Sequence, residues 1–148
     1  MRALKHRNLI SLHEVYETDH SIYMVMESLE GGNLKDCLLG TKTTISKSAC
    51  INIMMGILKG LIHMHKKGIM HRDLKPENIL FRNSLFLEDS VCLADFGLAS
   101  YVNEPKYLFF RCGTPGFVAP EILNNKDENA HYTEKCDIFS LGVILHIL

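Results

Sequence analysis

The residues best suited to chemistry lie in one stretch, residues 71–78, which reads His-Arg-Asp-Leu-Lys-Pro-Glu-Asn. Within eight positions it combines acidic, basic and carboxamide side chains with a proline that stiffens the backbone. Apolar runs at 68–70 and 79–81 flank it, which predicts a polar loop held between two short buried strands. Taken alone, such a stretch would more often be a charged surface turn.

Two further motifs follow in the sequence. Asp95, Phe96 and Gly97 come at the end of a buried strand predicted over 91–94, and Asp95 lies 17 residues after Asn78. A carboxylate at a strand end suits Mg²⁺, which prefers oxygen ligands, and glycine permits a sharp backbone turn. Residues 112–121 then read Cys-Gly-Thr-Pro-Gly-Phe-Val-Ala-Pro-Glu. The order of these motifs argues against the surface-turn interpretation.

In this order the motifs resemble those of the eukaryotic protein kinases. Residues 71–78 match the catalytic loop H-R-D-L-x-x-x-N at every defined position, 95–97 match D-F-G, and 119–121 match A-P-E. The resemblance covers essentially the whole chain. Gly-Thr-Pro at 113–115, with Lys75, is similar to Ser/Thr kinases and not to tyrosine kinases. The longer Gly-Thr-Pro-Gly-Phe form is most similar to the calcium/calmodulin-dependent kinase group.

The resemblance implies roles for five residues in phosphoryl transfer from ATP to a Ser or Thr hydroxyl of a protein substrate. Asp73 would accept the proton of the attacking hydroxyl, and Lys75 would hold its ammonium near the transferred phosphate. Thr114 would hydrogen-bond both of these side chains. Asn78 and Asp95 would supply oxygen ligands to Mg²⁺ at the ATP phosphates.

The resemblance also implies an ATP site beside a hinge. Residues 22–26 form a near-continuous apolar run, which predicts a strand buried on both faces. The two glycines within 27–33 then mark a flexible connection, which without the other motifs would be an ordinary loop. Met26 would be the gatekeeper, and the backbones of Glu27 and Leu29 would hydrogen-bond the adenine. The residues implied to bind ATP are Met26, Glu27, Leu29, Asn33, Glu77 and Leu80.

The predicted fold class is α+β, with residues 1–148 forming a partial protein kinase domain. Residues 1–26 would be a residual β-hairpin of the small lobe and 27–33 the hinge. Residues 34–148 would be the mostly helical large lobe, through the family's αF helix.

Three further helices are predicted before the helix that resembles αF. Short helices are expected at 34–39 and 121–123. A long helix is expected over 46–67, where apolar residues recur at i, i+3, i+4 and i+7. His65, at the end of its apolar stripe, is expected to be a hydrogen-bonded core histidine and not a metal ligand.

The resemblance further implies contacts that hold the catalytic loop. Asp137 would accept hydrogen bonds from the loop backbone, although its position also suits a helix N-cap. Leu12, His71 and Phe96 would stack near Met1, as in the regulatory spine of the family.

Composition restricts the alternatives. The 148 residues are enough for one domain with a sizeable core. A net charge of −1 gives no reason to expect a nucleic acid or an anionic membrane as partner. The five cysteines form no C-x-x-C pair, which indicates reduced thiols and a cytoplasmic, intracellular protein, with the nucleus not excluded. The first residues contain no apolar h-region, so no signal peptide is expected, and no apolar run approaches the ~20 residues of a membrane span.

Several parts of the family pattern do not occur in this sequence. No Gly-rich loop, no V-A-I-K lysine and no glutamate of the preceding helix come before residue 12. The chain is therefore expected to be a kinase fragment that is inactive alone. The alternative is a catalytically inactive truncated kinase that serves as an interaction module. The usual phosphate-acceptor position of the activation segment falls on Phe110, so control by a regulatory segment outside this chain is expected.

Overall fold

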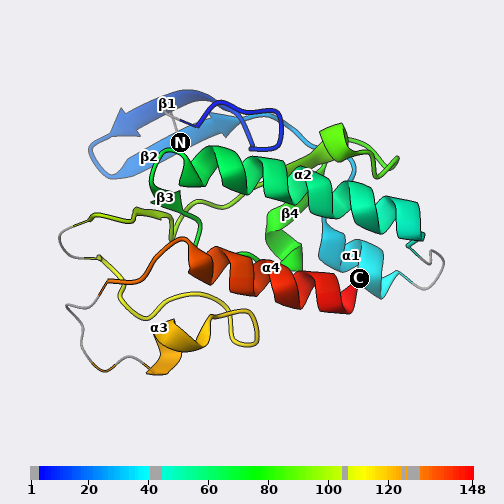
Figure 1. The fold of residues 1–148 in the computed structure, drawn as a ribbon. Coiled ribbons are helices and arrows are strands. Elements are labelled where there is room, and N and C mark those ends of the chain that lie inside the picture. The colour runs from blue at the N-terminus through cyan, green and yellow to red at the C-terminus, as the bar shows by residue number, and fades with distance from the viewer. Residues whose placement is uncertain (1–3, 41–44, 105–106, 125, 127–130) are drawn as a thin grey trace.

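The computed structural model describes residues 4–40, 45–104, 107–124, 126 and 131–148. Helices and short two-stranded sheets alternate along these residues, which confirms the expected α+β class. Figure 1 shows α2 across the middle of the molecule, with the β1–β2 hairpin on one side and α4 on the other. The elements are β1 (Leu12–Thr18), β2 (Ser21–Met26), α1 (Leu34–Leu39), α2 (Lys47–His65), β3 (Ile69–Met70), η1 (Pro76–Asn78), β4 (Ile79–Phe81), η2 (Glu88–Ser90), β5 (Val91–Leu93), β6 (Ser100–Tyr101), α3 (Pro120–Asn124) and α4 (Lys135–Ile147).

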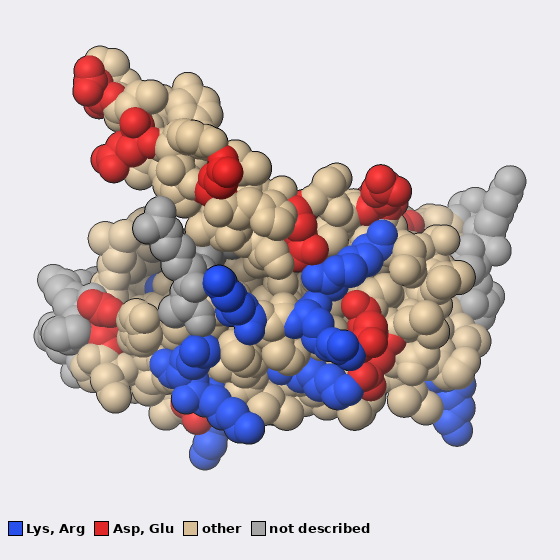
Figure 2. All heavy atoms as spheres, turned by 90° about the horizontal axis from the view of Figure 1, so that it is seen from above, with Lys and Arg blue, Asp and Glu red and all other residues tan. Residues whose placement is uncertain are grey.

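The hairpin of β1 and β2 pairs antiparallel from Thr18↔Ser21 to Leu12↔Met26. The strand predicted over 22–26 is confirmed, but its predicted burial is wrong, because all six residues of β2 are exposed. An apolar run indicates that a strand will form, but it does not indicate which elements will pack against that strand. None of the described elements covers the faces of β2, and Figure 2 shows the hairpin projecting from the body as an arm.

Helix α2 forms where the periodic apolar pattern predicts it. The Ser46 side chain caps its start by accepting a hydrogen bond from the Ala49 amide at 3.2 Å. Its inward face carries Ile53, Ile57 and Leu61, all at 1% exposure or less. Burial of each such side chain stabilises the fold by about 1.5–3 kcal/mol. The helix is therefore held mainly by its packing.

Two glycines let α2 lie directly against β5. A Cβ atom added at Gly56 would come 2.6 Å from Val91 Cβ, and one added at Gly60 would come 2.9 Å from the Asn8 carbonyl oxygen. Both distances are shorter than real Cβ contacts. Because β5 pairs with β4 and leads to Asp95, the helix fixes the strand that carries this candidate ligand.

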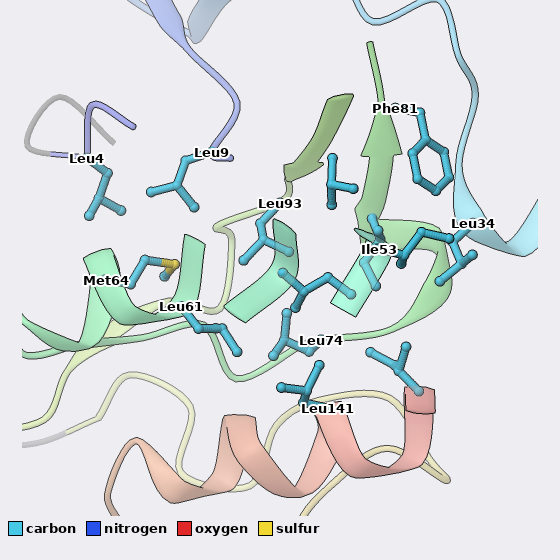
Figure 3. Packing of buried hydrophobic residues seen from close by; sticks show 14 of the residues in the cluster. Leu4, Leu9, Leu34, Ile53, Leu61, Met64, Leu74, Phe81, Leu93 and Leu141 are labelled. Carbon is cyan, nitrogen blue, oxygen red and sulfur yellow. The ribbon is translucent and has the colours of Figure 1, made fainter. Parts of the chain in front are cut away.

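The main core joins buried residues of α2, β4, β5 and α4 and includes Leu74 of the 71–78 loop, which is fully buried. In Figure 3, Leu141 points from α4 toward Leu74, with Leu61 approaching from α2. A second, smaller hydrophobic cluster includes side chains from the segment after residue 98. It consists of Met70, Tyr107, Ala119, Ile122, Tyr132 and Cys136. In the described ranges, the helices are too short or too polar to cross a bilayer.

Candidate functional site

The loop 71–78 lies between β3 and β4, as the sequence predicts, and Asp137 holds its start. The carboxylate of Asp137 accepts hydrogen bonds from the backbone amides of His71 (Oδ2, 2.9 Å) and Arg72 (Oδ1, 2.8 Å). Asp137 is fully buried in the first turn of α4, whose N-cap is Glu134, so the N-cap alternative is wrong. His65 Nε2 lies 2.9 Å from Asp137 Oδ2, which confirms the expected hydrogen-bonded core histidine.

The imidazole of His71 joins the loop to the segment after β5. Its Nδ1 accepts from the Asp73 amide at 3.3 Å, and its Nε2 lies 3.0 Å from the Ala94 carbonyl oxygen. The ring also packs against Phe96, with 5.4 Å between centroids. The predicted contact of His71 with Phe96 is thus confirmed. The place of Leu12 in the stack stays a prediction, and Met1 lies outside the described residues.

Asp73 has three side-chain partners: Thr114, Lys75 and Asn78, whose Nδ2 donates to Asp73 Oδ2 at 3.3 Å. Thr114 Oγ1 donates to Asp73 Oδ1 at 2.6 Å, and Lys75 Nζ lies 2.9 Å from Asp73 Oδ2. Lys75 also donates to Thr114 Oγ1 at 2.9 Å, which closes a triangle of polar contacts. Burial of Asp73 raises the pKa of its carboxyl, but the hydrogen bonds of Thr114 and Lys75 and the charge of Lys75 outweigh burial and leave that pKa below 3.8. Asp73 is therefore a carboxylate at neutral pH.

The pairing of β4 with β5 brings the backbones next to Asn78 and Asp95 together, because Ile79 pairs with Leu93. The backbone amide of Ala94 donates to the Asn78 carbonyl at 2.9 Å, which brings the start of β4 next to the end of β5. The Asn78 side-chain Nδ2 donates to the Asp73 carbonyl at 2.9 Å, so the amide nitrogen faces the loop and leaves Oδ1 as its acceptor. Asp95 is exposed and has φ +59°, a left-handed conformation that Asp tolerates better than most residues.

The donor set at Asn78 and Asp95 fits Mg²⁺ rather than a softer metal. Both side chains offer oxygen, the ligand that Mg²⁺ prefers. Among the described residues, no three His, Cys, Asp or Glu side chains gather into a group that could hold a metal. One carboxylate and one amide suit an ion that takes its remaining ligands from water and substrate phosphates.

The residues expected to bind ATP lie around the connection after β2. The Glu27 amide donates to the Ser11 carbonyl at 3.0 Å, while its carboxylate accepts two hydrogen bonds from Arg82 Nη2 at 3.0 and 3.1 Å. Leu29 and Leu80 are half-buried, and Met26 is 41% exposed. The sequence did not point to the Arg82 contact, because Arg82 belongs to a predicted polar turn.

The second half of this connection is fixed to β4. Gly31 donates to the Phe81 carbonyl, and Phe81 donates to the Gly32 carbonyl, each at 2.9 Å. Asn33 forms an isolated bridge with Leu80, and its side chain caps α1 by accepting from the Asp36 amide at 2.9 Å. Of the predicted ATP-binding residues, Asn33 is therefore held directly beside Leu80 of β4.

Arg72 binds the segment after Asp95 at two points. Its Nε donates to the Leu98 carbonyl at 2.6 Å, and its Nη1 donates to the Phe109 carbonyl at 2.9 Å and to the Tyr132 hydroxyl at 2.8 Å. The guanidinium carbon also lies 5.1 Å from the centre of the Tyr107 ring, a cation–π distance. Arg72 is only 6% exposed, so a buried cation with neutral partners holds this segment.

Glu77, also in the 71–78 loop, forms an ion pair with Lys35 that the sequence did not reveal. Lys35 Nζ of α1 lies 2.9 Å from Glu77 Oε1. The two residues are 42 positions apart, and only the packing of α1 against η1 brings them together.

The chemistry available at this site is proton acceptance combined with stabilisation of negative charge. An ionised carboxylate, an ammonium and a hydroxyl converge at Asp73, and Asn78, a candidate ligand for a hard cation, contacts Asp73. This combination suits the transfer of a phosphoryl group to a hydroxyl.

Comparison with known proteins agrees with this geometry. The protein kinase domain profile matches residues 1–148. Over its full length the chain is 45% identical to the human serine/threonine-protein kinase DCLK3, 38% identical to the serine/threonine-protein kinase cds1 of Schizosaccharomyces pombe, and 39% identical to a probable myosin light chain kinase of Dictyostelium discoideum. It covers 22%, 32% and 47% of these relatives, less than half of each. The chain belongs to the protein kinase family.

Proposed function

We propose that the protein containing this chain is a serine/threonine kinase that transfers the γ-phosphate of ATP to a Ser or Thr hydroxyl of a protein substrate. The observation that carries the proposal is the triangle of Asp73, Lys75 and Thr114, held in place from beneath by Asp137. Similarity to kinases that are named as serine/threonine enzymes supports the acceptor type.

Asp73 is the proton acceptor in this proposal. Its low pKa makes it a weak base, but its ionised form is present throughout the physiological pH range. The hydrogen bond from Thr114 occupies Oδ1, so the carboxylate has a fixed orientation toward an incoming hydroxyl. Positioning of this kind is the main requirement of phosphoryl transfer, because the transition state is loose and needs little covalent assistance.

The remaining catalytic residues would stabilise the negative charge of the phosphates. The ammonium of Lys75 is anchored between Asp73 and Thr114, from where it stabilises negative charge on the transferred group. Asn78 and Asp95 would hold Mg²⁺, which when bound neutralises phosphate charge. Met26, Glu27, Leu29, Asn33, Glu77 and Leu80 are the proposed ATP-contacting residues.

Three finer assignments belong to the same proposal. The Gly-Thr-Pro-Gly-Phe motif at 113–117 supports membership of the calcium/calmodulin-dependent group. All five cysteines are free thiols, which supports a reducing, intracellular compartment. The domain division proposed is a small-lobe hairpin over 1–26, a hinge over 27–33 and a large lobe over 34–148, with a regulatory segment outside the chain.

Replacement of Asp73 tests the proposal directly. In the full-length protein, Asp73→Asn should lower kcat for phosphorylation of Ser/Thr peptides by at least ~10²-fold, because the proton acceptor is lost. ATP affinity should change little. The measurement is peptide phosphorylation with radiolabelled ATP, together with calorimetric titration of Mg-ATP.

Asp89→Asn is the matched control, since the Asp89 side chain is 60% exposed and, among the described residues, its ion pair is with exposed Arg7. It should leave kcat unchanged. Undiminished turnover in Asp73→Asn would remove Asp73 from its proposed role. A wild-type protein that phosphorylates no Ser/Thr peptide would instead favour the interaction-module alternative.

A further inference from the structure

The ion pair of Lys35 and Glu77 lies at the rim of the proposed catalytic site. Glu77 immediately precedes Asn78, whose side-chain amide touches Asp73 Oδ2 at 3.3 Å. Lys35 reaches it from the first turn of α1, with 2.9 Å between Nζ and Oε1. The side chains are 49% and 38% exposed, so both are open to solvent.

A polypeptide that presents a hydroxyl to Asp73 must pass this rim. An extended chain advances ~3.4 Å per residue, so side chains two or three positions from the acceptor can reach groups bordering the site. A free carboxylate there would attract arginine, whose guanidinium binds carboxylates with two parallel hydrogen bonds. In this protein Lys35 already occupies one of the two oxygens and neutralises the charge.

The protonation equilibria of both side chains agree with a formed ion pair. The hydrogen bond from Lys35 lowers the pKa of Glu77, and the hydrogen bond to Glu77 raises the pKa of Lys35. Asn33 lies two residues before Lys35 and adds no charge. Its amide is used within α1, where Nδ2 donates to Asp36 Oδ2 at 2.7 Å.

We propose that Lys35 is a specificity-determining residue that masks Glu77, so that the kinase does not select substrates with arginine close to the acceptor. This inference rests on the proposed kinase function. Lys35 is a positioning residue for Glu77, and the substrate side chain that it excludes is a cation.

The test compares peptide preference in variants of the full-length protein. Ser peptides carry either Arg or Gln at one of the three positions on each side of the acceptor, and the ratio of kcat/KM for Arg over Gln is measured at each position. Lys35→Gln should raise this ratio by about two- to fivefold at one position, the range expected for an exposed ion pair. Lys35→Glu should raise it further. The ratio cancels any change in basal activity.

Two further variants decide whether the effect passes through Glu77. The double variant Lys35→Gln/Glu77→Gln should show the wild-type ratio. Lys47→Gln removes an exposed lysine from the first turn of α2 and serves as the control for loss of one positive charge. Gln and Glu are both tolerated near a helix N-terminus, so the Lys35 variants should keep α1 intact.

The outcomes separate this inference from the proposed function. Equal ratios in wild type and Lys35→Gln, with normal phosphorylation, would overturn the inference alone. A raised ratio that persists in the double variant would also overturn it. If the wild-type protein phosphorylates none of the peptides, the proposed function fails and the inference fails with it. Raised salt should reduce the gain, because exposed charges are screened.

Discussion

Asp73 is a buried carboxylate that remains ionised because of two neighbours. At 8% exposure its burial favours the protonated form, and the contacts with Thr114 and Lys75 reverse that preference. The family resemblance predicted the hydrogen bonds of Thr114 with Asp73 and with Lys75, but it did not predict the contact of Lys75 with Asp73. Their energetic balance could not be predicted, because it depends on the depth of burial.

Removal of the Thr114 hydroxyl should shift this balance. The folded pKa of Asp73 lies below its unfolded value, so ionised Asp73 stabilises the fold above the unfolded pKa, and this contribution is lost as pH falls through the folded pKa. Thr114→Val keeps the side-chain shape but deletes one donor, while burial still favours the protonated form. The pKa of Asp73 should therefore rise toward its unfolded value, and the stability that Asp73 loses on acidification should become smaller. Carbon-13 NMR titration of the Asp73 carboxyl measures the change.

Thr133→Val is the control for this titration, because Thr133 is exposed and distant from the loop in sequence. It should leave the Asp73 titration unmoved. An identical Asp73 curve in Thr114→Val would show that the 2.6 Å hydrogen bond does not determine the pKa.

Other site residues could not be paired from sequence. Glu27 with Arg82 and Lys35 with Glu77 join residues 55 and 42 positions apart. Neither pair belongs to a motif of defined spacing. Each arises because one element packs on another, so single-sequence patterns contain no signal for them.

At the scale of elements, the segment after Asp95 is held by aromatic packing around Arg72. Phe110 packs against the second hydrophobic cluster, and Tyr132 donates to its carbonyl at 3.1 Å. The buried guanidinium of Arg72 is bound by two carbonyls and a hydroxyl of this chain. The segment thus has an internal substitute for the phosphate that could otherwise bind Arg72.

Phosphatase treatment should accordingly preserve the proposed kinase activity. In the full-length protein, activity on peptides should stay within about twofold after the segment is dephosphorylated, because the Arg72 contacts need no added charge. Mass spectrometry must confirm that the segment is bare. Loss of activity that returns only with phosphate on Ser100, Tyr101 or Tyr107 would contradict the prediction.

Secondary structure was easier to predict than burial. The long helix, the short helices at 34–39 and 121–123, and the strands around the loop all formed near their predicted positions. These elements have strong periodicity, caps or flanking turn residues. Strand β2 has the apolar composition of a buried strand, yet it is exposed, because composition does not specify a packing partner.

For the molecule as a whole, stability should be unequally distributed. The hairpin contributes two strands with little packing, and an isolated two-stranded hairpin is marginal in water. Helix α2 forms one wall of the main core. In hydrogen-exchange mass spectrometry of the 148-residue chain, amides of β1 and β2 should exchange on the order of 10²-fold faster than buried amides of α2.

Peptides from β4 and β5 provide the internal comparison, since these strands are also a two-stranded sheet but are buried. They should be protected nearly as well as α2. Equal protection of the hairpin and α2 would show that the hairpin is stabilised by contacts beyond those described.

The bonds from Asp137 to the loop have a consequence for biosynthesis. Asp137 is added to the chain 66 residues after His71 and 65 after Arg72. At ~5–20 residues per second, roughly 3 to 13 s separate synthesis of the loop from synthesis of its anchor. During that interval the two loop amides have no carboxylate to bind. A nascent chain therefore cannot set the loop geometry that phosphoryl transfer requires until α4 has emerged from the ribosome and folded.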